Sequence, residues 1–276
     1  HNISAKLWNP KIKLPENSKL IHFVRHGQGY HNLIEEIAIE SGAKFTDVAD
    51  YNIAIQEKRF YLKQELQDPP LTSKGFNDAK NLQTQLESNM RLNSNSNSNK
   101  NICSELSDLS LTPTLFIISP LKRATQTILI GFNKQLSCPN PVPIIALESC
   151  REQYGIYYSD KRSNITNNKI EFPIVNYDNI IHDEDVSWSP TSRETMLDMC
   201  MRQEQFLDFV YNRIETNIVV GTHSAWLYSL FNIVLVTDNV TDNVTDNVTD
   251  NEHDKNKLSS MFSTGELRSV VLTWDS

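Results

Sequence analysis

The sequence predicts an α/β fold built on a mostly parallel sheet. Short apolar runs recur along the chain and alternate with stretches of helical periodicity, the pattern of strands joined by crossover helices. Several of these runs are almost continuously apolar, which is typical of strands covered on both faces. With 276 residues, 39% of them hydrophobic, the chain is long enough to bury a large core.

Five runs are predicted to be strands. The first, second and fourth lack the alternation of a half-exposed strand, so helices are expected on both sides of the sheet. The predicted strands are Leu20 to Val24, Leu115 to Ser119, Pro143 to Leu147, Ile218 to His223 and Val270 to Trp274.

Four helices are predicted between the strands. Thr72 is a suitable N-cap for a helix that runs to about Leu86, with an apolar face at Phe76, Ala79 and Leu82. The other predicted helices are Leu121 to Phe132, Arg193 to Ile214 and Ala225 to Leu235.

Two polar segments are predicted to be low-complexity insertions in a single domain of residues 1–276. The segment at about 91–110 carries too little apolar surface to offset the entropy of ordering. The segment at about 236–257 contains "VTDN" four times. Its regular aspartates suggest a calcium loop, but the glycine turn and bidentate glutamate of such a loop are missing, so a solvated loop is favoured.

Composition excludes several partners. Lys and Arg number 26 against 34 Asp and Glu, a net charge of −8, so a general attraction to nucleic acid or anionic membranes is not expected and any anion site must be a local cationic pocket. No run approaches the roughly 20 apolar residues of a membrane span. The expected partner is therefore a small molecule, and the sequence leaves the oligomeric state open.

The four cysteines are widely spaced and form no metal-ligand pattern, which argues against a structural zinc site. A reduced, cytoplasmic protein fits this usage best. The first twenty residues lack the apolar centre of a secretory signal, but the chain begins at His1, so its native N-terminus stays open. The cysteines are Cys103, Cys138, Cys150 and Cys200.

Reactive side chains follow the predicted strands where each one ends. In a parallel sheet these carboxyl ends share one edge, where ligands bind. Two arginines and two histidines there, beside the N-termini of helices, suit an anion. The segments are "RHG" from Arg25, "SPLKR" from Ser119, "LESCRE" from Leu147 and "GTHS" from Gly221.

This set of groups matches the chemistry of phosphoryl transfer. Guanidinium groups spread the charge of phosphoryl oxygens well, a neutral imidazole can attack phosphorus to give a phosphohistidine, and a carboxylic acid can protonate the departing oxygen and later activate water. Because the protein supplies the cations, we expect neither a metal nor another cofactor.

Several motifs in the same order resemble the histidine phosphatase superfamily, which includes the phosphoglycerate mutases. The resemblance covers about residues 20–274, and it implies a phosphoglycerate mutase-like three-layer α/β/α sandwich. "RHGQGYHN", "CREQYGIYYSDKRS" and "FSTGELRSVVL" look like the fungal and plant phosphomutase-like phosphatases, which implies a hydrolase more than a mutase. The other matching motifs are "DPPLTSKG", "SPLKRATQT", "LESCREQYG" and "VVGTHS".

The resemblance also implies roles for individual residues. His26 would be the nucleophile, with Arg25 and Arg123 gripping the phosphoryl oxygens. His223 would donate to the same oxygens, and Asn32 would hold phosphate from the side. Glu152 is the implied proton donor, while Gly27 would accept the other N–H of the His26 ring and fix its tautomer.

Some alternatives stay open at the level of sequence. Lys122 adjoins Arg123, Glu148 could replace Glu152 as proton donor, and Arg151 could simply pair with either carboxylate. A phosphoglycerate-type mutase and a catalytically silent scaffold remain alternatives to a metal-independent phosphomonoesterase.

Two features of the sequence bear on the substrate. The "THSAW" segment has Ser224, Ala225 and the bulky Trp226 after its histidine, where many relatives have two glycines. The pocket floor is therefore expected to carry these three residues, which leaves the size of the substrate open but not the chemistry. The aromatic and acidic run from Tyr154 to Trp188 is predicted to form a lid or a specificity wall.

Overall fold

The computed structural model describes residues 3–40, 63–93, 113–235 and 257–274. Most of both predicted insertions, 94–112 and 236–256, therefore lies outside the described residues, and so does the VTDN repeat. The helix predicted to end near Leu86 continues to Asn93.

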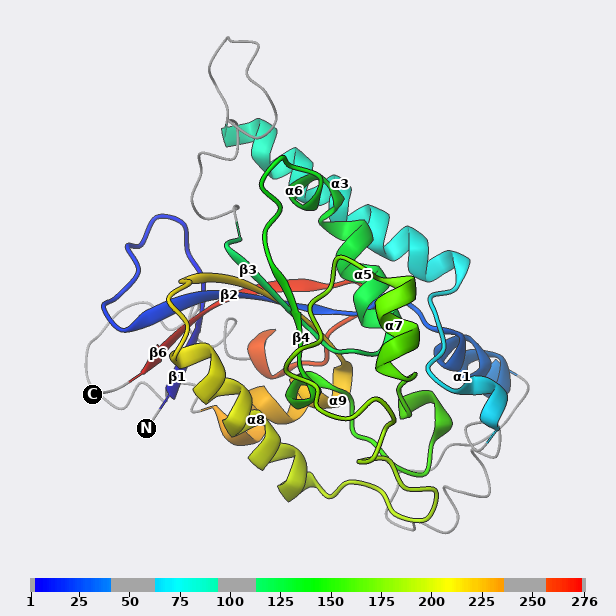
Figure 1. The fold of residues 1–276 in the computed structure, drawn as a ribbon. Helices are drawn as coiled ribbons and strands as arrows, with labels where there is room; N and C mark the ends of the chain where they lie inside the picture. Colours follow the sequence, from blue (N-terminus) through cyan, green and yellow to red (C-terminus); the bar gives the residue numbers. More distant parts are fainter. Residues whose placement is uncertain (1–2, 41–62, 94–112, 236–256, 275–276) are drawn as a thin grey trace.

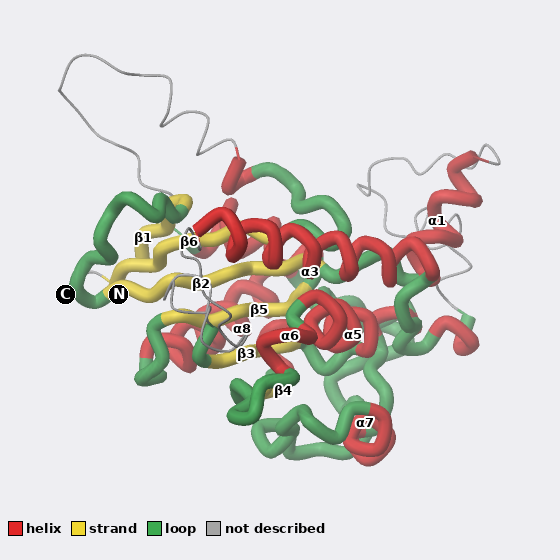
Figure 2. The backbone as a smooth tube through the Cα atoms, turned by 90° about the horizontal axis from the view of Figure 1, so that it is seen from above, coloured by secondary structure: helices red, strands yellow, loops and turns green. Residues whose placement is uncertain are grey.

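The centre of the fold is a six-stranded sheet with the order β1-β6-β2-β5-β3-β4 (Figure 2). Neighbouring strands from β2 to β4 are parallel, whereas β6 runs antiparallel to both β1 and β2. The predicted mostly parallel sheet is thus confirmed. The strands are β1 (Ile3–Leu7), β2 (Ser18–Arg25), β3 (Leu115–Ile118), β4 (Ile144–Ala146), β5 (Asn217–Thr222) and β6 (Leu267–Trp274).

Helices cover both faces of the sheet, which gives three layers (Figure 1). One face carries α3 and α5, and the other carries α8 and α9. The helices are α1 (Tyr30–Glu40), α3 (Ser73–Asn93), α5 (Lys122–Gly131), α6 (Asn133–Leu136), α7 (Ile165–Glu171), α8 (Met196–Tyr211) and α9 (Ser224–Ser229), and α9 continues into the π-helical turn η5 (Leu230–Val234).

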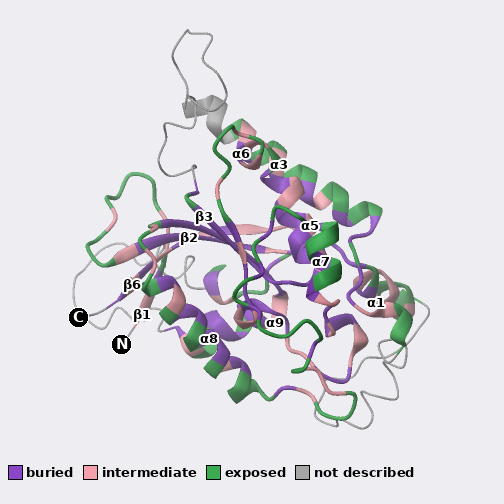
Figure 3. Cartoon of the chain, viewed as in Figure 1, coloured by how far each residue is buried: buried purple, intermediate pink, exposed green. Residues whose placement is uncertain are grey.

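The continuous apolar runs are explained by two separate cores. Successive residues of a strand point to opposite faces, so Leu115 and Ile117 of β3 join the core under α8 while Phe116 and Ile118 join the core under α3 and α5. All four side chains have no exposed surface, and Figure 3 shows the central strands buried along their length. A strand with both faces covered therefore has a nearly continuous apolar sequence.

Helix ends follow the predicted capping. The Thr72 hydroxyl accepts the N–H of Gly75 at 3.1 Å, so Thr72 caps α3 as predicted. In that helix Ala79 and Leu82 are buried, whereas Phe76 is exposed. Thr195 starts α8 through a capping box with Asp198, three residues later than the sequence suggested.

In the described ranges, no helix is both long enough and apolar enough to cross a membrane.

Candidate active site

The carboxyl ends of four neighbouring strands place the predicted site residues together. Strands β2, β5, β3 and β4 are adjacent and parallel, so the segments that follow them leave from one edge of the sheet. Arg25 ends β2, His223 follows β5, Arg123 lies in the first turn of α5 after β3, and Glu152 follows the 3₁₀ turn η3 (Glu148–Cys150) after β4.

His26 is buried with one ring nitrogen committed and the other directed at a cation. Its Nδ1–H donates to the carbonyl of Gly27 at 2.6 Å, so Nε2 carries the lone pair. The Nε–H of Arg123 donates to that Nε2 at 3.3 Å. Burial, and then the charges of Arg123 and Arg25, hold the pKa of His26 well below its usual value. The imidazole is therefore neutral and nucleophilic at Nε2.

The backbone beside His26 requires glycine. A Cβ on Gly27 would lie 2.5 Å from the carbonyl oxygen of Gly75, so only glycine lets this loop pack against the start of α3. That close approach fixes the carbonyl that holds the His26 ring.

Two guanidinium groups supply positive charge beside the imidazole. Arg25 donates from Nη1 to the carbonyl of Phe262 at 2.5 Å, and its buried Nε has no hydrogen-bond partner among the described residues. Arg123 has no exposed surface. Arg123 already pairs with the carboxylate of Asp160 at 3.1 Å, whereas the buried Nε of Arg25 is an unsatisfied donor within the described ranges. Since such a donor is costly to bury without a partner, this side of the pocket is suited to an anionic ligand.

Two further imidazoles lie against His26. The ring centroid of His223 is 4.9 Å away and that of His31 is 5.7 Å away. Burial and then the charge of Arg123 hold the pKa of each well below its usual value. The His223 Nε2 bonds to the Ser119 hydroxyl at 2.7 Å, and its buried Nδ1 has no hydrogen-bond partner in the described part of the chain. Nδ1 of His223 is therefore the ring nitrogen that can still bond to a ligand oxygen.

Glu152 lies at the start of α9 beside the cations of the pocket, whereas Glu148 pairs with other arginines. Glu152 accepts backbone N–H groups of Ala225 and Trp226 at 3.2 Å each, which places it at the start of α9, and its charge interacts with that of Arg25. Burial, followed by the charge of Asp160, raises the pKa of Glu152.

Glu148 is occupied elsewhere. Its carboxylate pairs with Arg151 at 2.8 Å and with Arg162 at 2.6 Å, and Arg151 in turn forms a buried pair with Asp185. The geometry therefore assigns Glu148 and Arg151 to a network that ties the segment after η3 to the loop around 182–185.

Two other sequence alternatives are resolved by position. Lys122 Nζ pairs with Glu171 of α7 at 2.8 Å, whereas the guanidinium of the next residue, Arg123, bonds to His26. Asn32 lies in the first turn of α1, and its side-chain oxygen accepts the N–H of Gly29 at 3.0 Å. Its amide stabilises the loop after His26, and a direct contact with phosphate stays a prediction.

The expectation that the Trp226 side chain lies on the pocket floor is wrong. Its side chain has no exposed surface and packs in the core under α8, with the indole N–H donating to the carbonyl of Ser149 at 2.8 Å. The reason is the direction of α9: its first turn presents backbone N–H groups to the pocket and turns the indole toward the sheet.

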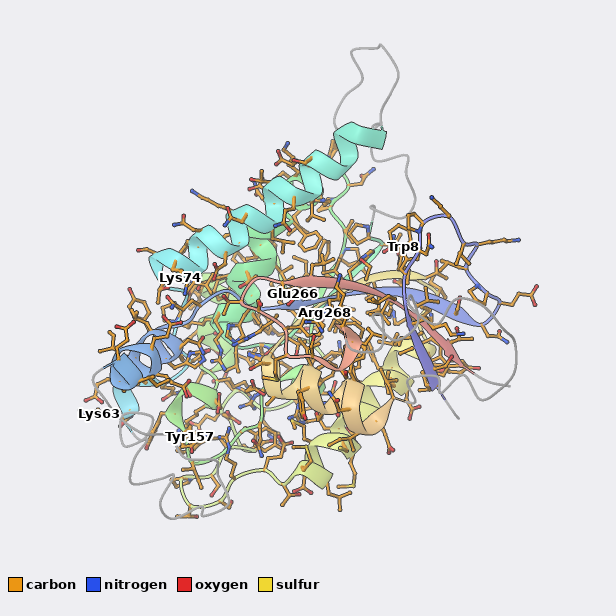
Figure 4. The ribbon with its side chains drawn as sticks, turned by 180° about the vertical axis from the view of Figure 1, so that it is seen from behind. Trp8, Lys63, Lys74, Tyr157, Glu266 and Arg268 are labelled. Carbon is orange, nitrogen blue, oxygen red and sulfur yellow. The ribbon has the colours of Figure 1, made fainter. Side chains whose placement is uncertain are left out.

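The predicted wall does reach the site. The 3₁₀ turn η4 (Tyr158–Asp160) contacts Arg123, whose Nη1 donates to the carbonyl of Ser159 at 2.6 Å. Figure 4 shows Tyr157 at the end of the molecule that also carries Lys63, opposite Trp8. The aromatic segment thus lies beside the carboxyl edge of the sheet.

Three residues near this site were not singled out from the sequence: His31, Asp160 and Arg193. The second histidine of "RHGQGYHN" was a visible signal for His31. The other two lie in irregular segments, where spacing carries no information about contact.

Among the described residues, no group of three His, Cys, Asp or Glu side chains could hold a metal ion.

No protein-family model matches the chain. A "Phosphoglycerate mutase-like protein" of Arabidopsis thaliana is 25% identical over 92% of this chain and 84% of its own length, and "Phosphoglycerate mutase-like protein 2" of the same plant is 28% identical over 92% and 74%. "Phosphomutase-like protein 3" of Candida albicans is 28% identical over 82% and 64%.

Solved structures were compared as well. A putative alpha-ribazole-5'-P phosphatase from Escherichia coli has a TM-score of 0.47 at 16% identity, covering 92% of this chain and 91% of its own. A mycobacterial glucosyl-3-phosphoglycerate phosphatase has a TM-score of 0.40 at 14% identity over 77% and 78%. Curated plant relatives named phosphoglycerate mutase-like align with 92% of this chain. Together with the ordered motifs, this similarity supports the histidine phosphatase superfamily as the group the chain resembles.

Proposed function

We propose that the protein is a metal-independent phosphatase that hydrolyses small phosphomonoesters through a phosphohistidine. The observation that carries this proposal is the state of His26: a buried neutral imidazole whose unprotonated Nε2 accepts a hydrogen bond from a guanidinium. An imidazole whose ring is fixed by a backbone carbonyl, beside two cations that attract an anion, is suited to attack phosphorus.

The first half of the reaction forms the phosphoenzyme. Nε2 of His26 attacks phosphorus, and the bond from phosphorus to the ester oxygen breaks. The proton of Glu152 passes to that oxygen, so the alcohol leaves neutral. Arg25 and Arg123 carry the positive charge that faces the phosphoryl oxygens, and this is the task a metal performs in other phosphatases.

The second half returns the enzyme to its starting state. Glu152, now a carboxylate, takes a proton from water as the oxygen of that water attacks phosphorus. The bond from phosphorus to Nε2 breaks, inorganic phosphate leaves, and both His26 and Glu152 are again neutral. The nucleophile and the acid need to be neutral at the same pH, and the lowered pKa of His26 and the raised pKa of Glu152 favour that condition.

A direct test is to follow p-nitrophenyl phosphate and 3-phosphoglycerate in the presence of a chelator. We expect free phosphate from the aryl ester, with a rate unchanged by the chelator. Isomerised phosphoglycerate with little free phosphate would favour a mutase instead, and an inactive protein would favour a silent scaffold. A rate that is lost with the chelator and restored by a metal ion would contradict the proposal.

Glu152→Gln is expected to lower kcat/KM for an alkyl phosphate by about 10²-fold, because a poor leaving group needs the proton. The loss in the first half-reaction should be smaller for p-nitrophenyl phosphate, whose leaving group is stable as an anion. In the wild type, the rate should fall as pH rises through the raised pKa of Glu152. This fall at high pH is the alkaline limb of the pH profile. The variant should lose the alkaline limb, and pH profiles with both substrates will measure the loss.

The matched control is Glu148→Gln, the same change on the carboxylate that pairs with Arg151 and Arg162. It should lower the melting temperature and keep the alkaline limb. An alkaline limb that disappears in Glu148→Gln and persists in Glu152→Gln would reverse the assignment.

The cytoplasm is the compartment we assign to this activity. Cys150 and Cys200 form no disulfide in the described part of the chain, and burial raises the pKa of the Cys150 thiol to about 12, so that thiol is inert. Fractionation of cells that make the full-length protein, native N-terminus included, tests the assignment.

A further inference from the structure

The run from Tyr154 to Trp188 that was predicted to form a wall, the wall segment, bonds to the outer edge of the Arg123 guanidinium. Its Nη1 donates to the carbonyl of Ser159 at 2.6 Å and its Nη2 donates to Oδ1 of Asp160 at 3.1 Å. With Nε directed at Nε2 of His26, the planar fork is fixed at three corners. A planar group held on one edge presents its other donors in a defined direction.

Asp160 is itself held by a second arginine. Its Oδ2 accepts from Nη1 of Arg193 at 3.1 Å, and Arg193 also donates to the carbonyl of Gly155 at 2.8 Å and stacks over the ring of Tyr157 at 4.3 Å. Asp160 is only 5% exposed. A carboxylate whose two oxygens bond to two different guanidinium groups has little freedom to turn.

The charge of Asp160 also acts on Glu152. After burial, it is the leading cause that raises the pKa of Glu152, and the charge of Arg123 opposes it. The backbone N–H groups at the start of α9 also favour the charged carboxylate, as does Arg25. Arg202 and Arg151 reach this region through backbone carbonyls, those of Glu152 and Asp160 respectively. Asp160 is therefore the negative charge that counters the cations around Glu152.

We propose that Asp160 is a positioning residue of the reaction: it fixes the Arg123 guanidinium beside Nε2 of His26 and places a negative charge on that side of the pocket. This inference rests on the proposed phosphatase activity. It assigns the wall segment a part in the chemistry, because Asp160 lies in η4.

The test compares pH profiles of kcat/KM for an alkyl phosphate. Asp160→Asn removes the charge at constant shape, so we expect the alkaline limb to move to lower pH by about half a unit or more. Arg193→Gln leaves Asp160 charged and removes a cation that neutralises it, so the alkaline limb should move to higher pH. Opposite shifts are a signature that loss of structure alone does not produce.

Two further variants complete the design. Asp160→Glu keeps the charge and should restore the alkaline limb toward that of the wild type. Asp178→Asn makes the same chemical change at an exposed position of the same segment and should leave the profile unchanged. Melting temperatures of all variants are measured in parallel.

The outcomes separate this inference from the proposed function. A wild-type protein without phosphatase activity would overturn both. An active wild type whose alkaline limb is the same in Asp160→Asn would overturn the role of Asp160 and leave the phosphatase standing. Should Asp160→Asn fail to fold, Arg193→Gln decides, since an unmoved limb or one moved to lower pH contradicts the proposal.

Discussion

Replacing His26 by alanine is expected to lower phosphatase turnover by a factor of about 10³ or more, because no other group can form the covalent intermediate. The His26 side chain is buried with its Nε2 directed at Arg123. The neighbouring rings of His223 and His31 have centroids 4.9 and 5.7 Å away, and neither shares the carbonyl contact that orients His26. Rapid quenching of the wild type with labelled substrate should trap phosphate that is acid-labile and stable to alkali.

The control for this experiment is His182→Ala, because His182 is an exposed histidine far along the chain in the wall segment. It should turn over substrate at the wild-type rate and trap phosphate equally well. Phosphate trapped on a serine, or trapped undiminished in His26→Ala, would contradict the role of His26 as the nucleophile.

Arg123→Lys is expected to lower kcat/KM by about 10³-fold although the charge is retained, since several oriented donors are lost together. The guanidinium reaches Ser159, Asp160 and His26 at the same time, and an ammonium group cannot span these three points. Steady-state rates with p-nitrophenyl phosphate measure the loss, and inorganic phosphate as a competitive inhibitor should bind more weakly.

Lys122→Met is the matched control, because it removes the neighbouring cation, whose partner is Glu171 of α7. We expect its kcat/KM to stay within about twofold of the wild type, as for most changes of exposed ion pairs. A large loss in Lys122→Met together with a mild one in Arg123→Lys would show that the other cation of "SPLKR" serves the pocket.

Much of the fold could be predicted because burial on both faces leaves a strong mark on a strand. The runs at Leu115–Ile118 and Asn217–Thr222 have buried residues throughout, so their positions were apparent. The edge strand β1 was missed because Ile3–Leu7 is only partly buried and too short to show a pattern. Strand order was also beyond prediction, since it depends on pairing between distant segments.

The candidate site was predictable where its residues follow a strand directly. Arg25, His26 and His223 continue from β2 and β5, so the sheet alone fixes where their backbone lies. Asp160 and Arg193 reach the pocket through turns and loops without a repeating period, and only the folded chain shows that they meet. The error over Trp226 has the same cause, because the sequence does not show which face α9 turns toward the sheet.

The pairing of β2 with β5 couples catalysis to the slowest contacts of folding. Its register sets Arg25 opposite Thr222, two residues from widely separated parts of the chain, and contacts of such long sequence separation form late and slowly. During refolding from denaturant, helical signal should return before any turnover is seen. The rate at which phosphatase turnover returns should therefore report the rate at which the central sheet closes.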